Sequence, residues 1–149
     1  MRAGHGILQL GLAMTASLAL AQSTPPGVSM SVPDASALTS QPGDPSRGRR
    51  LVVDRQQGFC LLCHSGPFPE ERFQGTLAPD LSIRAGQRVA QDVRAQLLAP
   101  DRFNPDTIMP AYGPPTTKGV RVHPQFQGKP LLQPQDIEDV VAFLMQMPP

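Results

Sequence analysis

The stretch Cys60-Leu61-Leu62-Cys63-His64 decides how this chain folds. Two thiols three residues apart, followed directly by a histidine, form the attachment signal for a c-type haem. Because Cys60 and Cys63 would lie one helical turn apart, each can bond a haem vinyl group as a thioether, and His64 is left to bind the iron as proximal ligand. These are the only 2 cysteines in the chain. We therefore expect one covalent haem c, with Cys60, Cys63 and His64 as its first binding residues.

Other uses of a Cys-x-x-Cys pair must be weighed against this interpretation. A zinc site needs two further Cys or His ligands at a similar short spacing, and only His123 is left beyond the signal segment. A thioredoxin-like pair belongs to a β-α-β pattern, and no strand-like alternation surrounds residue 60. A disulfide between the two thiols remains the third alternative.

Residues 1–21 have the pattern of a secretory signal peptide. Arg2 supplies the positive start, an apolar run follows, and Ala19 and Ala21 form a small-x-small cleavage site. The run is shorter than the ~20 residues that a membrane-spanning helix needs. We therefore expect cleavage after about Ala21, no membrane span, and a periplasmic protein. Without Arg2 the chain has 12 basic and 12 acidic residues, which argues against a nucleic-acid partner.

The mature chain should consist of an extension and one small domain. Residues 22–43 contain four prolines among small polar residues and show no apolar periodicity, so they are expected to be a linker or a segment that orders on a partner. Residues 44–149 form the cytochrome domain. Its core is thin for its size, and a covalent haem would give it a large apolar body around which to fold.

Apolar periodicity predicts an all-α domain. One helix should cover residues 44–59 with Asp44 as its N-cap, a second residues 87–98, and a third should begin near Pro134. Gly48 would let another helix approach the first one closely. The acidic residues near the start of the last helix, Asp136, Glu138 and Asp139, are expected on a solvated face.

Two further residues are expected to complete the haem site. A histidine ligand usually donates its second ring N–H to a fixed acceptor, and the carbonyl of Pro79 is our candidate. Met109, held extended by Pro110, is the expected sixth ligand of the iron. The alternatives are a loop histidine, His123, and the other late or linker methionines, Met30, Met145 and Met147.

This ligand pair predicts electron transfer rather than catalysis. With His64 and Met109 on the iron, no position stays open for oxygen chemistry, and the methionine raises the reduction potential. The sequence offers no Ser-His-Asp set and no spare thiol, so we expect no catalytic residue. A haem sensor with an open sixth position is a weaker hypothesis.

The order of helix, haem motif, Pro79 loop, Met-Pro loop and terminal helix resembles a class I cytochrome c. Closer similarity points to the SoxX family, the small monohaem subunit of the SoxAX complex of sulfur-oxidising bacteria. The segments that carry it are residues 58–64, 104–113, 126–132 and 137–144. Together the resemblance spans residues 46–147. One departure is Ala78, which stands where many cytochromes c have glycine before the proline.

The resemblance implies a class I cytochrome c fold of three to four helices and loops around one haem c. It further implies a heterodimer with a SoxA-type cytochrome subunit, which couples thiosulfate to a cysteine of a sulfur-carrier protein. In this L-cysteine S-thiosulfotransferase the SoxX subunit accepts electrons and passes them to an external cytochrome c. The alternative is a free-standing, diffusible class I cytochrome c. Phe68, Phe73 and Phe103 are candidates for an apolar docking surface or for the haem pocket.

Overall fold

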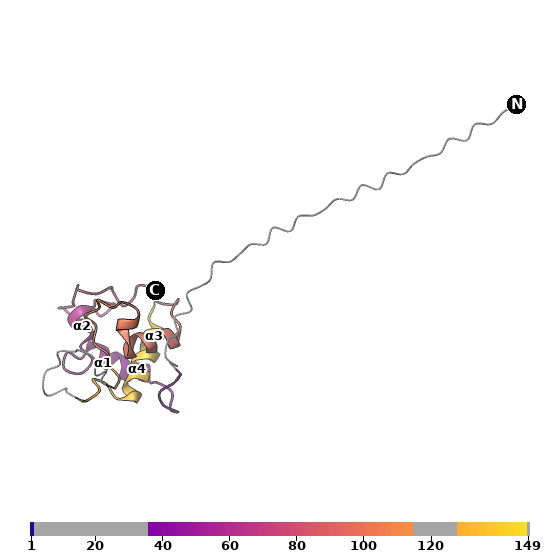
Figure 1. Cartoon of the computed structure of the whole chain (residues 1–149). Coiled ribbons are helices and arrows are strands. Elements are labelled where there is room, and N and C mark those ends of the chain that lie inside the picture. The colour runs from indigo at the N-terminus through magenta and orange to yellow at the C-terminus, as the bar shows by residue number, and fades with distance from the viewer. Residues whose placement is uncertain (2–35, 115–127, 149) are drawn as a thin grey trace. The chain divides into compact units, whose positions relative to one another are not determined.

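The computed structural model describes Met1, residues 36–114 and residues 128–148. Every element described here belongs to the compact unit Ser31–Pro149. Its elements are α1 (Pro45–Val53), α2 (Cys60–Cys63), α3 (Ala90–Leu98), the 3-10 turn η1 (Pro100–Arg102) and α4 (Pro134–Gln146), as Figure 1 shows. No strand occurs in the described ranges, so the all-α prediction is confirmed. None of the described helices is long and apolar enough to cross a membrane.

Helix α1 begins where it was predicted to begin but ends early. Asp44 caps it by accepting hydrogen bonds from the backbone N–H groups of Ser46 and Arg47, at 2.8 and 3.1 Å. The helix ends at Val53, and the expectation that it continues to about residue 59 is wrong. The reason is Asp54, whose carboxylate accepts the backbone N–H groups of Gln56 and Gln57 at 2.7 and 3.0 Å and so stabilises a turn.

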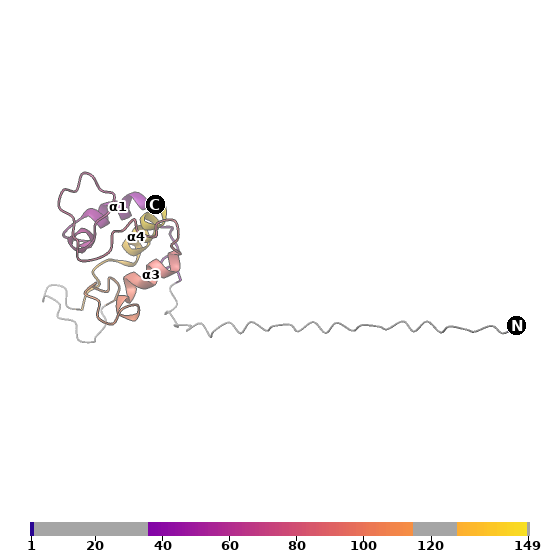
Figure 2. The same cartoon turned by 90° about the horizontal axis from the view of Figure 1, so that it is seen from above.

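Helices α1 and α4 form the central pair of the domain and lie side by side in both views (Figures 1 and 2). Gly48 makes the close approach possible, because a Cβ built there would lie 1.9 Å from the carbonyl oxygen of Asp139. The same Cβ would lie 2.9 Å from the Cβ of Phe143. The prediction that Gly48 admits a neighbouring helix is confirmed.

The apolar stripe of α4 faces the core, whereas that of α3 does so only in part. Ile137 and Val140 of α4 are each 1% exposed. Helix α3 starts at Ala90, three residues later than predicted, and Val89 is exposed. A turn closed by the hydrogen bond from the Gln87 N–H to the Arg84 carbonyl occupies the residues before it.

The expectation that Glu138 and Asp139 are solvated is wrong, because both are buried. Glu138 receives two hydrogen bonds from the Arg94 guanidinium of α3, at 2.7 and 2.8 Å. Asp139 receives two from Arg47 of α1, at 2.6 and 2.9 Å. Each carboxylate of α4 therefore meets an arginine from a different helix, and the two pairs join α4 to both neighbours.

The residues just before α1 form a strap along α4. The backbone N–H of Leu38 donates to Glu138 at 2.9 Å, and that of Asp44 donates to Asp139 at 2.7 Å. Thr39 Oγ1 bonds the side chain of Gln135 at 2.8 Å. The last residues of the proline-rich segment are thus ordered against the domain rather than free of it.

Candidate functional site

The two cysteines lie at the two ends of α2, a single helical turn. Both thiols are free and half-buried. The Cys60 thiol lies 3.4 Å from the Gly58 carbonyl oxygen, and burial raises its pKa to about 11. Within the described ranges no three His, Cys, Asp or Glu side chains lie close enough together to hold a metal ion. The zinc alternative therefore gains no support from the described residues.

His64 follows α2 directly and is held by one hydrogen bond from its side chain. Its Nδ1 lies 2.6 Å from the carbonyl oxygen of Pro79, which is the contact predicted from the sequence. A carbonyl can only accept, so Nδ1 carries a proton, and in the neutral ring the lone pair is then on Nε2. This is the state of the ring that a metal-binding histidine requires.

The Pro79 carbonyl is fixed because two segments pair around it. The Ala78 N–H donates to the Cys63 carbonyl at 3.0 Å, and the Leu81 N–H donates to the Ser65 carbonyl at 2.8 Å. Ala78 in place of the usual glycine therefore does not displace the carbonyl from His64. This pairing was not predicted, since neither segment has a strand pattern.

Asp80 adds a side-chain bond to the same pairing. Its carboxylate accepts the hydroxyl of Ser65 at 2.8 Å, and the backbone N–H and hydroxyl of Ser82 at 2.8 and 2.6 Å. Hydrogen bonds from Ser82 first, and then from Ser65, lower the pKa of Asp80 against the opposing effect of burial. An ionised carboxylate therefore lies next to the group that orients His64. It was not among the residues predicted from the sequence.

Met109 lies half-buried in the loop after η1. Its backbone N–H donates to Thr107 Oγ1 at 3.1 Å, and its sulfur lies 4.0 Å from the side-chain nitrogen of Gln96 in α3. Of the alternatives, Met145 and Met147 pack against the core at the end of α4. Met30 and His123 lie outside the described residues.

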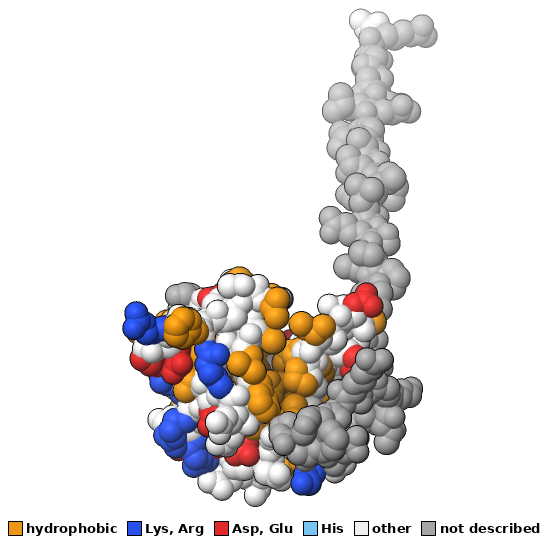
Figure 3. All heavy atoms as spheres, turned by 90° about the vertical axis from the view of Figure 1, so that its left-hand side faces the viewer, with side chains coloured by type: hydrophobic (Ala, Val, Ile, Leu, Met, Phe, Trp, Pro, Cys, Tyr) orange, Lys and Arg blue, Asp and Glu red, His pale blue; other side chains and the backbone are white. Residues whose placement is uncertain are grey.

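Large apolar side chains are exposed on α2 and on the loops between α2 and Met109. They are Leu62, Phe73, Leu77, Ile83, Val89, Phe103 and Ile108. Figure 3 shows hydrophobic side chains gathered in the middle of one face of the molecule. Phe68 does not belong to this group, because it is 1% exposed and its ring packs against that of Phe143 at 6.0 Å. The interpretation of Phe68 as a docking residue is therefore wrong.

The hydrogen bonds of Arg88 show whether its guanidinium has a donor to spare for a haem. Its Nη2 donates to the carbonyl oxygens of Leu81 and Ile83, the second at 2.9 Å. Its Nη1 is buried and is the one buried side-chain donor or acceptor without a partner among the described residues. Burial, and next the charge of Arg84, lower the pKa of Arg88. Arg88 is half-buried, and its unused Nη1 is a donor of the kind that the carboxylates of a haem accept, so the donor set fits the group.

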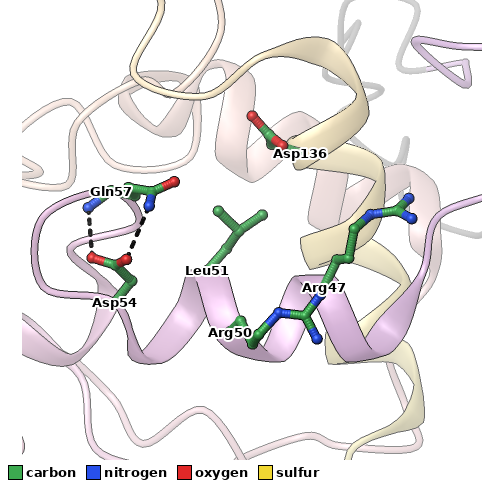
Figure 4. A pocket seen from close by; sticks show the side chains of 6 residues that line it. All are labelled: Arg47, Arg50, Leu51, Asp54, Gln57 and Asp136. Atoms are coloured by element: carbon green, nitrogen blue, oxygen red, sulfur yellow. Dashed lines mark hydrogen bonds between the residues drawn. The ribbon is translucent and has the colours of Figure 1, made fainter.

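An open pocket of about 270 Å³ lies elsewhere, against α1 (Figure 4). Arg47, Arg50, Leu51, Asp54, Gln57 and Asp136 line it. Two of these side chains bond each other, since Gln57 donates to Asp54 at 3.0 Å. None of the predicted site residues lines this pocket, and charges of both signs surround it.

Comparison with known proteins identifies the family of the chain. No protein-family model matches the chain. No curated protein matches it either. Among solved structures, a chain of the SoxXA crystal structure from P. pantotrophus shares 32% sequence identity with it, with a TM-score of 0.65. The match covers 74% of this chain and 85% of that one. In fold and in sequence, therefore, the chain belongs to the SoxX family, a cytochrome subunit of the complex written SoxXA or SoxAX.

Proposed function

We propose that this chain is a periplasmic monohaem c-type cytochrome and the electron-transfer subunit of a SoxAX complex. In that complex, thiosulfate is joined oxidatively to a cysteine of a sulfur-carrier protein, and the chain passes the electrons to an external cytochrome c. Residues 1–21 are its signal peptide, cleaved after about Ala21, residues 22–43 are its extension, and residues 44–149 are its cytochrome domain.

The proposal assigns each site residue a role toward haem c. Cys60 and Cys63 would hold the group by thioether bonds, and His64 and Met109 would bind its iron. The Pro79 carbonyl orients His64. Arg88 binds a haem carboxylate through its unused nitrogen. When bound, the haem supplies a one-electron redox centre.

The observation that carries the proposal is the bond of 2.6 Å from His64 Nδ1 to the Pro79 carbonyl. It fixes the tautomer and the direction of the ring, so that Nε2 is preorganised as a metal ligand. A histidine held in this way suits a centre whose ligands move little between two redox states. The methionine would be a neutral and soft ligand, which favours the reduced state.

The chain needs a partner for the sulfur chemistry. Its two thiols are used for haem attachment, and no further cysteine exists to bind iron or to carry sulfur. The oxidative step therefore belongs to the SoxA-type subunit, and the chain alone is not an enzyme.

The test is a reconstitution of the mature, haem-loaded chain with a SoxA-type subunit and its carrier protein. Thiosulfate-dependent reduction of an added cytochrome c should require both subunits, and a pull-down from the native periplasm should return a stoichiometric partner with its own haem. A monomer that exchanges electrons freely but holds no partner would instead indicate a diffusible cytochrome c.

A further inference from the structure

We infer that Tyr112 is a positioning residue that fastens the Met109 loop to the haem-attachment segment. The residue is 3% exposed, and its hydroxyl donates a hydrogen bond of 2.7 Å to the carbonyl oxygen of Gly58. The two residues are separated by 54 positions. The bond therefore joins the loop that carries Met109 to the segment that carries Cys60, Cys63 and His64. The inference rests on the proposed ligation of the iron by Met109.

The Gly58 end of the bond is itself immobilised. A Cβ built on Gly58 would lie 2.0 Å from the carbonyl oxygen of Leu51, so the backbone there lies directly against α1. The next residue, Phe59, has a φ of 59°, a left-handed conformation that a non-glycine residue adopts only when its surroundings hold it there. The Cys60 thiol lies 3.4 Å from the same carbonyl oxygen. The carbonyl that accepts the Tyr112 hydroxyl thus belongs to the backbone that positions Cys60, the residue expected to form the first thioether bond to haem.

The Tyr112 end is fixed by its backbone as well as by its ring. Its N–H donates to the carbonyl of Leu97 in α3 at 2.9 Å, and its own carbonyl accepts the N–H of Leu132, just before α4, at 3.1 Å. Met109 stands three residues earlier in the same loop. Movement of this loop away from the haem-attachment segment therefore requires breaking the hydroxyl bond of Tyr112.

The thioether of Met109 is a neutral ligand, so its affinity for the iron depends strongly on how well the loop is preorganised. The hydroxyl of Tyr112 stays protonated and able to donate, since burial raises its pKa. Its removal would leave the buried Gly58 carbonyl without this donor and would loosen the loop while leaving the covalent bonds to haem untouched.

The test uses the mature, haem-loaded chain with Tyr112→Phe. Ferric protein is titrated with imidazole, which competes with Met109 for the iron, and displacement is followed by the loss of the methionine–iron absorption band. We expect half-displacement at an imidazole concentration about tenfold lower than in the unaltered chain, the ratio expected when one buried hydrogen bond is lost. Haem staining after denaturation should be unchanged.

Thr39→Val is the matched control, because it also removes a half-buried hydroxyl, the one that bonds Gln135 at 2.8 Å. It should weaken the fold without moving the imidazole midpoint. An unchanged midpoint in Tyr112→Phe, or an equal shift in both variants, would overturn the inference. Met109→Ala distinguishes a failure of this inference from a failure of the ligand assignment in the proposed function. If that variant keeps its low-spin spectrum, Met109 is not the ligand, and both the ligand assignment and the inference about Tyr112 fail. A high-spin spectrum leaves the ligand assignment standing.

Discussion

Replacing Arg94 with methionine should destabilise the domain by about 3 to 5 kcal/mol near neutral pH, the usual cost of removing one partner of a buried ion pair. The side chains of Arg94 and Glu138 are only 9% and 7% exposed. Methionine fills most of the arginine's volume, so the loss comes from the charge left behind rather than from a cavity. Glu138 would keep the hydrogen bond from the Leu38 N–H at 2.9 Å. The loss is a large fraction of the roughly 5 to 15 kcal/mol that stabilises a typical domain.

The pH dependence identifies charge as the cause. Burial alone would raise the pKa of Glu138, but Arg94 and the Leu38 N–H outweigh it, and the pKa is lowered. The pair therefore contributes stability above the unfolded pKa of about 4.3, and this contribution is lost as the pH falls through the folded pKa. Without Arg94, burial is opposed only weakly, and Glu138 should bind a proton at a higher pH. The difference between the two proteins must therefore shrink as the pH falls from about 7 to about 5.

Urea unfolding of the haem-loaded proteins, followed by far-ultraviolet circular dichroism at both pH values, measures this difference. The double variant Arg94→Met with Glu138→Leu should recover most of the stability, because no charge is then left buried. A loss below about 1 kcal/mol in the single variant, or an equal loss at both pH values, would refute the role of the buried charge.

Two further substitutions test the packing of α1 against α4 and the surroundings of His64. Gly48→Ala should destabilise the protein by about 1 to 3 kcal/mol in the same unfolding assay, although alanine has the better helix propensity. The reason is that the new Cβ would lie 1.9 Å from the Asp139 carbonyl oxygen. Ser46→Ala, on the exposed face of α1, is the control and should leave the free energy of unfolding unchanged. Asp80→Asn should raise the reduction potential by about 40 mV in redox titration, since it removes a negative charge beside the partner of His64. An unchanged potential would show that the charge does not act on the iron.

The sequence predicted the local features whose causes are local. Asp44 and Pro45 specify the start of α1, and the apolar stripe of α4 identifies its buried face. The contact of His64 with Pro79 was also predictable, because a histidine expected to bind iron needs an acceptor and few segments could supply one.

Features that depend on a partner distant in the sequence were not predictable in this way. Glu138 and Asp139 have the pattern of a solvated helix start, and only the arrival of Arg94 and Arg47 from other helices makes their burial possible. The early end of α1 had a local cause that was overlooked, the Asp54 side chain.

The site shows the same division. The pairing that fixes Pro79 joins residues about 15 positions apart through backbone groups, which carry no residue-specific signal. Arg88 stands in an ordinary polar stretch, and nothing but its burial and its unused nitrogen marks it out. Phe68 was a candidate for a docking surface or for the haem pocket because it lies in a loop, yet that loop folds its ring onto Phe143.

The spin state of the haem iron in Met109→Ala is the decisive test of the proposed His64/Met109 ligation. Met145→Ala is the control, since Met145 is also half-buried and also packs against the core, but from α4 rather than from the loop after η1. We predict that the ferric spectrum of the mature, haem-loaded chain turns from low spin to high spin in Met109→Ala alone, with the haem still covalently attached. A low-spin spectrum that survives the loss of Met109 would contradict the proposed ligand pair.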